Sequence, residues 1–396
     1  MEWKEVRLGD VCSELSDGLH KAPKFIVNGE YIFVNAKNLY NGYILDNDPT
    51  KKTSHEEYLK YKKPLGKHTI LYSIDGTIGN IAKYRGEKCV LGKGACYINC
   101  NPEIVESSYL YYQLQSPHFK SYIHLMSTGS TIKHISLKTM RDYVFELPSL
   151  DDQRRIASIL SSLDRKIELN NKINADLEEM AQAIFKNWFV DFEPFKDGKF
   201  VDSELGMIPE GWKVGTLEDI AEITMGQSPA GNSLNENREG MIFYQGSSDF
   251  GFRFPSIRVF TTEPKRLAVA NSVLFSVRAP VGDINVAKEE CCIGRGVASI
   301  KSKYGHDSYL FYAMKSLHKL FDSFDGEGTV FGSINKKTLS AIQILLPSDG
   351  IVEQFNNIAS SFDNRIRSLS DENSRLSLLR DTLLPRLMSG ELEIPE

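Results

Sequence analysis

The feature that most constrains the fold is a long segment, residues 149–189, that contains neither proline nor glycine. Its apolar residues recur every three or four positions, which is the spacing of one stripe along an α-helix. Such a helix would be roughly 60 Å long at about 1.5 Å per residue, too long for the interior of an ordinary small domain. The stripe comprises Ile156, Ile159, Leu160, Leu163, Ile167, Ile173, Leu177, Met180, Ile184 and Trp188.

A second segment, residues 348–388, carries a similar stripe. Two long apolar stripes in one chain most simply bury each other, and at a spacing near 3.5 residues they form a coiled coil. The second stripe comprises Val352, Phe355, Ile358, Phe362, Ile366, Leu369, Leu376, Leu379, Leu383 and Leu387.

Two asparagines occupy corresponding positions in these predicted helices. Asn373 falls between Leu369 and Leu376, where an apolar residue is expected, and Asn174 is its counterpart in the first helix. Either both asparagines face solvent, as polar residues usually do, or they lie in the apolar seam and specify its register.

The helices end two copies of an internal repeat. Short motifs recur in the same order, and the offset between copies stays at 199 residues from Gly129 and Gly328 to the start of the helices. Such ordered self-similarity indicates duplication of a structural unit. The matched motifs include Trp3-Lys4 with Trp212-Lys213, Leu71-Tyr72-Ser73 with Leu274-Phe275-Ser276, Gly92-Lys93-Gly94 with Gly294-Arg295-Gly296, Tyr109-Leu110 with Tyr309-Leu310, and Leu147-Pro148-Ser149 with Leu346-Pro347-Ser348.

The repeat divides the chain into five parts. Within each globular unit, β-type runs broken by glycines dominate, with one or two short helices between them, which is typical of an α+β fold. The predicted parts are a first domain at 1–148, a long helix at 149–191, a connector at 192–211, a second domain at 212–347 and a second long helix at 348–390.

Composition excludes several classes of protein. The chain of 396 residues has no apolar run of membrane-spanning length and begins with a charged segment, so we expect a cytoplasmic protein without a membrane partner. Its six cysteines lack metal-binding spacing, so we expect reduced thiols and no metal site. The net charge of −5 is uneven, because residues 1–148 carry +3 and residues 348–396 carry −4.

Recognisable catalytic patterns are missing from the sequence. No GxGxxG opens a helix after a strand, no GxxxxGK[ST] is present, and Asn101-Pro102 lacks the aromatic expected of an amino-methyltransferase motif. His124 and His134 have no partner at the spacing of a metal site or a catalytic triad. We therefore expect a protein that recognises a partner without catalysing a reaction, and we assign no catalytic residue.

Glycine-rich loops with hydroxyl and basic residues recur at matching places in both units. Backbone amides and hydroxyls can bind phosphates, while lysine and arginine neutralise charge and read guanine edges. Each residue alone could also be part of a solvated turn. The candidate DNA-binding residues are Lys21, Lys24, Ser73, Lys93, Thr131, Lys133, His134, Arg253, Ser276, Arg278, Arg295 and Thr329.

This organisation resembles the specificity subunit of type I restriction–modification systems. The resemblance rests on the W-K-x(3)-L-x-D start, the L-[FY]-S segment, G-[KR]-G, Y-L-[FY]-Y, the G-[ST] turn and the LPS before each long helix, all in duplicated order. It implies two β-rich target recognition domains of similar fold, joined by two long helices packed as an antiparallel coiled coil with pseudo-two-fold symmetry. It does not identify the residues that contact bases, because these lie in the variable segments, Ser13–Lys67 and Glu222–Ala270.

The same resemblance implies the function and the partners. The chain would be non-catalytic and would read an asymmetric two-part target on double-stranded DNA, one half-site per domain. It would recruit two methyltransferase subunits, which use S-adenosylmethionine to methylate adenine at N6, and restriction subunits, which use ATP and Mg²⁺ to translocate and cut DNA. No cofactor is expected on this chain.

Two other functions remain open from the residues alone. The chain could be a coiled-coil scaffold whose globular ends bind protein, in which case any DNA association would not fall steeply with salt. It could also be an enzyme with an unrecognised active site, such as a fused methyltransferase, which would bind S-adenosylmethionine by itself.

Overall fold

The computed structural model describes residues 3–47, 50–129, 133–324 and 332–392. The chain forms two compact units, residues 1–169 with 371–396, and residues 170–370. The boundaries fall inside the two long helices, because each half of a helix packs with a different domain. This division differs from the predicted one, in which the helices are separate from the globular domains.

The first domain is built on a four-stranded antiparallel sheet. Its order is β2 (Cys12–Asp17), β10 (Ala95–Cys100), β7 (Thr69–Ser73) and β8 (Ile81–Lys83). A second sheet joins β6 (Lys52–Thr53), β3 (Tyr31–Val34) and β9 (Cys89–Leu91). Strand β1 (Lys4–Arg7), at the start of the domain, pairs with β11 (Val144–Leu147) at its end, and β4 (Leu39–Tyr40) forms a short hairpin with β5 (Tyr43–Ile44). The helices are α1 (His55–Tyr61), α2 (Ser107–Gln113), α3 (Pro117–Met126) and α4 (Leu137–Arg141).

The second domain repeats the four-stranded sheet. Its order is β15 (Ala221–Met225), β23 (Val297–Ser302), β20 (Val273–Ser276) and β21 (Ile284–Val286), and β14 (Lys213–Thr216) pairs with β24 (Gln343–Leu346). The other sheet differs from that of the first domain, with five strands: β16 (Leu234–Asn235), β18 (Val259–Thr261), β17 (Met241–Tyr244), β22 (Cys291–Ile293) and β19 (Leu267–Ala268). The helices are α6 (Leu217–Ile220), α7 (Asp307–Ser316), α8 (His318–Asp322) and α9 (Lys336–Ser340).

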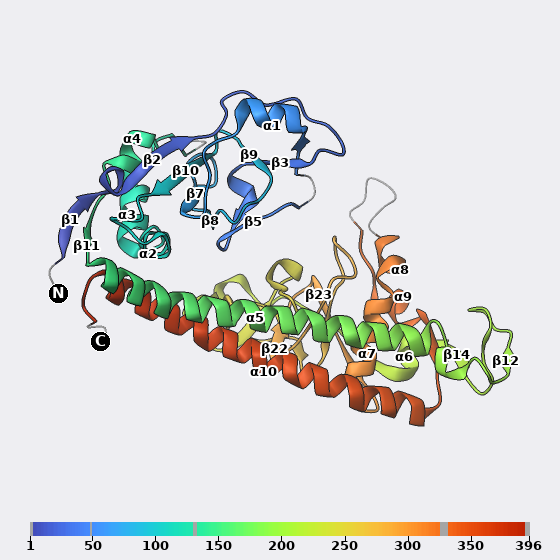
Figure 1. Ribbon diagram of the computed structural model, residues 1–396. Helices are drawn as coiled ribbons and strands as arrows, with labels where there is room; N and C mark the ends of the chain where they lie inside the picture. The colour runs from blue at the N-terminus through green and yellow to red at the C-terminus, as the bar shows by residue number, and fades with distance from the viewer. Residues whose placement is uncertain (1–2, 48–49, 130–132, 325–331, 393–396) are drawn as a thin grey trace. The chain divides into compact units, whose positions relative to one another are not determined.

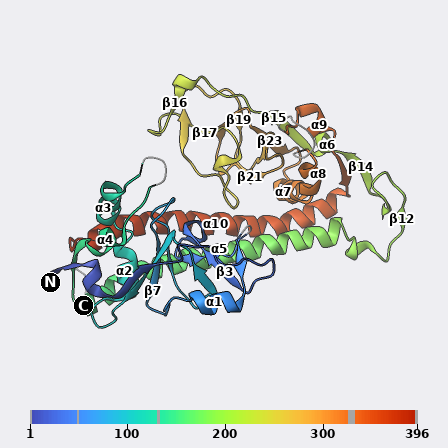
Figure 2. The same cartoon turned by 90° about the horizontal axis from the view of Figure 1, so that it is seen from above.

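The two long helices, α5 (Leu150–Phe189) and α10 (Asp349–Met388), are each 40 residues long. They lie side by side in both views (Figure 1, Figure 2). In the first unit, Asp164 on α5 binds Arg380 on α10, and Lys166 lies 3.4 Å from Glu372. Residue numbers rise along one helix as they fall along the other, so the predicted antiparallel pairing is confirmed.

Helix packing buries only part of each apolar stripe. The first unit packs Ile156 and Leu160 against Leu384 and Leu387 in its core, and the second packs aromatic residues of both helices together. Met180 and Leu379, at matching positions of the two helices, remain 51% and 46% exposed. The prediction that the two stripes bury each other was therefore wrong at these positions. The periodicity of apolar residues does not indicate how much of a helix surface its partner helix covers.

The predicted asparagine pair is only partly resolved by burial. Asn174 is buried at 3% exposure, so the solvent-facing alternative is wrong for this residue, whereas Asn373 is half-buried.

The connector contains one short antiparallel pair, β12 (Phe200–Val201) with β13 (Ile208–Pro209). Within the described ranges, no helix is both long enough and apolar enough to cross a membrane.

Candidate nucleic-acid interface

The first domain brings three loops together where strand β7 ends. The N–H of Ile74 donates to the carbonyl of Gly94 at 3.1 Å, and the carbonyl of Ile74 accepts from the N–H of Ile135 at 2.9 Å. These bonds place the loops that carry Lys93 and His134 beside the turn at 74–80. The tertiary structure thus gathers predicted residues that are about 40 positions apart in the chain.

An acidic residue lies at the centre of this loop cluster. The carboxylate of Asp75 is 3.8 Å from Nζ of Lys93 and 3.3 Å from Nδ1 of His134. Lys133 is exposed, and its carbonyl accepts from the N–H of Gly76 at 3.1 Å. Asp75 therefore offsets part of the positive charge that the sequence assigns to this site.

The second domain repeats the same backbone arrangement at the end of β20. The N–H of Val277 donates to Gly296 at 3.0 Å, and its carbonyl accepts from the N–H of Ile334 at 3.1 Å. Arg278, at the position that matches Asp75, and Arg295, at the position that matches Lys93, are both exposed. This loop cluster therefore presents two guanidinium groups at its surface.

A glycine permits the turn of the second cluster. Gly282 has φ of +99°, a conformation that side chains rarely adopt, and a Cβ atom there would lie 2.4 Å from Cβ of Phe321. Any other residue would meet both backbone strain and a clash. The turn therefore requires glycine at this position. In the sequence, this requirement is visible as the same spacing between the L-[FY]-S segment and the following glycine in both copies.

The first variable loop runs beside the loop of Lys93. The N–H of Leu19 donates to the backbone of β9 at 2.8 Å, which brings exposed Lys21 into this region. Lys24 is also exposed, and its N–H donates to Oε2 of Glu57 at 3.0 Å. Both lysines remain available for contact with a ligand.

Several predicted site residues are not at the surface. Ser73 and Ser276 are buried at 0% and 2% exposure. Oγ of Ser73 accepts from the N–H of Asn80 at 2.8 Å, and Oγ of Ser276 donates to a backbone carbonyl two residues on at 2.9 Å. The prediction that these two serines contact DNA is corrected, because both side chains are buried and form hydrogen bonds within their own turns. Thr131 and Thr329 lie outside the described residues.

Arg253 requires the largest correction. It is 3% exposed, and its guanidinium donates to Glu178 on α5 at 3.0 Å, to Asp363 on α10 at 2.5 Å and to the hydroxyl of Tyr312 at 2.9 Å. Glu178 also pairs with Lys315. A buried guanidinium with these partners cannot reach DNA; it connects the variable segment of the second domain to both helices.

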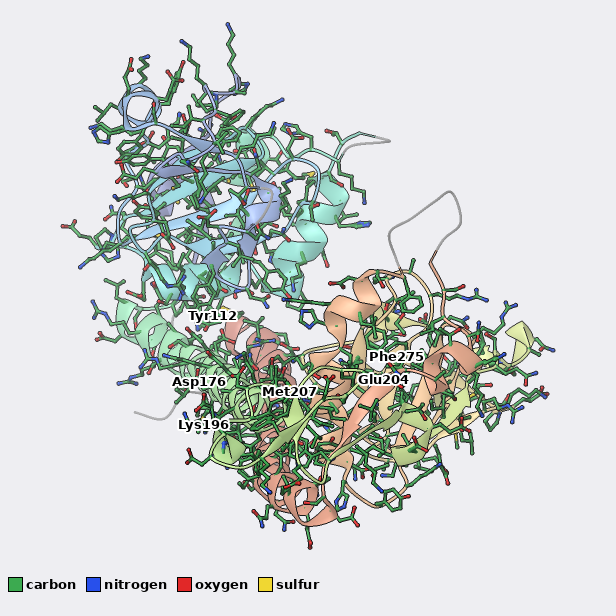
Figure 3. All side chains as sticks on the ribbon, turned by 90° about the vertical axis from the view of Figure 1, so that its right-hand side faces the viewer. Tyr112, Asp176, Lys196, Glu204, Met207 and Phe275 are labelled. Atoms are coloured by element: carbon green, nitrogen blue, oxygen red, sulfur yellow. The ribbon has the colours of Figure 1, made fainter. Side chains whose placement is uncertain are left out.

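A related connection exists in the first unit. The hydroxyl of Tyr112 donates to Asp164 on α5 at 2.6 Å, and Arg380 on α10 binds the other oxygen at 2.9 Å. Figure 3 shows Tyr112 where the first domain meets the helices. Tyr312 and Asp363 are the matching residues of the second unit, joined at 3.0 Å. Sequence reasoning missed these residues, although their matched positions in the repeat were a usable signal.

A half-buried lysine takes the place of Arg253 in the first domain. Nζ of Lys83 lies 4.5 Å from the ring centre of Tyr111 and 5.5 Å from that of Tyr112. Burial lowers the pKa of Lys83 to about 8 and raises that of Tyr111 to about 12. The two units thus use different cations above the same pair of aromatic positions.

Known proteins share both the sequence pattern and the fold. The chain matches the family described as type I restriction modification DNA specificity domain over residues 1–179 and 209–377. A putative type I restriction enzyme MjaX specificity subunit of Methanocaldococcus jannaschii is 33% identical over 370 residues, which cover 89% of this chain and 83% of that protein. The type I restriction enzyme HindI specificity subunit of Haemophilus influenzae is 25% identical over 479 residues, covering 99% of this chain and 100% of the relative.

The crystal structure of a type I restriction–modification S subunit from M. genitalium is similar, with a TM-score of 0.59 and 17% identity over 100% of this chain and 97% of that one. This likeness shows that the fold is shared. Because the family match covers both copies of the repeat and most of the chain, the protein belongs to the type I restriction–modification specificity subunits and carries two DNA specificity domains.

Proposed function

We propose that this chain reads an asymmetric, two-part target on double-stranded DNA, with one half-site per domain. The observation that carries the proposal is the pair of loop clusters at the ends of β7 and β20, built alike but bearing different side chains. Beside them, the variable segments contribute strands to a three-stranded sheet in one domain and to a five-stranded sheet in the other. Similar frames with different surfaces fit two half-sites of different sequence.

The helices would set the gap between half-sites and dock the partners. Each is 40 residues long, and each is tied to its domain through a tyrosine and an aspartate at matching positions. We propose that two methyltransferase subunits bind along them, that these use S-adenosylmethionine to methylate adenine at N6, and that restriction subunits use ATP and Mg²⁺. A methyltransferase acts on a base flipped out of the duplex, and this chain would hold its partner at the target sequence.

We propose that this chain recognises DNA and that its partner subunits supply the catalysis. Several ionisable side chains beside the helices form structural contacts: buried Arg253 and half-buried Arg380 bind carboxylates, and the buried Tyr112 and Tyr312 donate to carboxylates.

The test is to map methylated adenines in cells that express the chain with its methyltransferase partner. The expected result is a target with two different half-sites and a constant gap. A continuous target, or no methylation that depends on this chain, would contradict the proposal. A parallel binding assay distinguishes the protein-scaffold alternative, because DNA binding through phosphate contacts weakens steeply with salt.

A further inference from the structure

The two loop clusters have the same backbone but opposite charge at one position. Asp75 and His134 form an isolated bridge in the first domain, and Arg278 and Ser333 form the same bridge in the second. Because Arg278 adopts this backbone pairing as Asp75 does, the acidic side chain is not needed to shape the loop. The difference in charge therefore changes the surface that each loop presents and leaves its backbone the same.

In the second domain the backbone bond from Val277 to Gly296 places the loop of Arg278 beside the loop of Arg295. Arg278 and Arg295 occupy the positions that match Asp75 and Lys93. The acid–base pair of the first domain is therefore replaced by two arginines. Throughout the described ranges, neither guanidinium has a carboxylate partner. Neighbouring like charges repel, and an anion between them removes this cost.

We propose that Arg278 and Arg295 form a phosphate-binding pair, and that these two positions consequently supply more of the sequence-independent affinity for DNA than Asp75 and Lys93 do at the matching positions of the first domain. The ligand class is the phosphodiester backbone, which arginine binds through paired N–H donors. In the first domain Asp75 neutralises Lys93 and repels phosphate, so its loop cluster contributes less to non-specific binding. This inference rests on the proposed function. It adds that the matching positions of the two domains differ in how strongly they bind the DNA backbone.

The test measures how binding of a short random-sequence DNA duplex by the full chain depends on salt. Each lost phosphate contact lowers the slope of log K against log salt by about 0.9, which is about 3.5-fold in affinity over a fourfold change of salt. Arg278→Ala with Arg295→Ala is expected to lower the slope by about 1.8. Lys93→Ala is expected to change it less, and Asp75→Asn to strengthen binding.

Lys199→Ala is the matched control, because it removes one exposed positive charge from the connector. The inference is overturned if the double arginine variant keeps the wild-type slope. It is also overturned if that variant changes the methylated bases of a half-site at unchanged slope, since the arginines would then read bases. If the wild-type chain binds no DNA and directs no methylation, the proposed function itself fails.

Discussion

Replacing Arg253 by methionine is expected to destabilise the second unit strongly. Methionine keeps most of the side-chain volume but removes every donor that binds Glu178, Asp363 and Tyr312. The two carboxylates have side-chain exposures of only 6% and 20%, so water cannot fully replace the guanidinium. The variant therefore leaves acidic groups buried with incomplete compensation.

The expected loss can be worked out from these contacts. Removing one partner of a buried ion pair costs about 3–5 kcal/mol. Glu178 keeps Lys315 and Asp363 keeps Tyr312, so the low end, about 3 kcal/mol, is expected. For a unit of this size, that loss corresponds to a fall in Tm of about 6–12 °C.

Tryptophan fluorescence can follow the second unit alone. Trp188 and Trp212 lie in its core, and Trp3→Phe removes the signal of the first unit. Urea unfolding in this background would give the free energy of unfolding for each variant. Arg266→Met is the matched control, since Arg266 is exposed in the same domain and its replacement should cost less than about 0.5 kcal/mol.

A coupling measurement separates the ion cluster from simple loss of packing. With Glu178→Gln and Asp363→Asn already present, Arg253→Met should cost at least about 1 kcal/mol less, because the buried negative charges are gone. A loss below about 0.5 kcal/mol for Arg253→Met alone, the value typical of an exposed charge, would refute the reasoning.

Three further results are expected. The first concerns an insertion of seven residues into both helices, after residues 169 and 370. Because seven helical residues span about 10 Å, the gap between half-sites should lengthen by about three base pairs while the half-site sequences stay unchanged. Mapped targets with the original gap would contradict this. Because the pKa of Lys83 is lowered in the folded state, the unfolded chain binds more protons than the folded one between pH 8 and 10.5. The free energy of unfolding, measured relative to Lys83→Met, should therefore rise with pH in that window. A difference between the two proteins that does not change with pH in urea unfolding would count against this. Burial raises the pKa of Cys89, Cys96 and Cys291 to about 12, so these thiols should react with Ellman's reagent at pH 8 only after unfolding. Rapid reaction of these three thiols in the native chain would disprove their burial.

The extent of the long helices could be predicted because their signal is local. The segment predicted at 149–191 is helical over Leu150–Phe189, and the second, predicted at 348–390, over Asp349–Met388. An apolar stripe at helical spacing is visible in both segments. The first segment also lacks proline and glycine, whereas the second is helical despite Gly350 and Pro385. The duplicated motifs likewise indicated two domains of one fold, since each motif recurs in order.

The accessibility of the site residues could not be predicted. Arg253 lies in a polar variable segment, where an arginine ordinarily indicates a surface, yet its partners are acids 75 and 110 residues away on two helices. Ser73 resembles a surface hydroxyl but faces the inside of its turn. Burial depends on which segments pack together, and no local pattern contains that information.

By itself, then, the sequence determined the two long helices, the duplication of the domains and the family to which they belong, because periodicity and repeated motifs are properties of the linear chain. Only the tertiary structure decided which charges are free. It placed Asp75 against Lys93 in one loop cluster, left Arg278 and Arg295 exposed in the other, and buried Arg253 between a domain and its helices. The physical reason is that the charge presented by a loop depends on neighbours brought from distant parts of the chain.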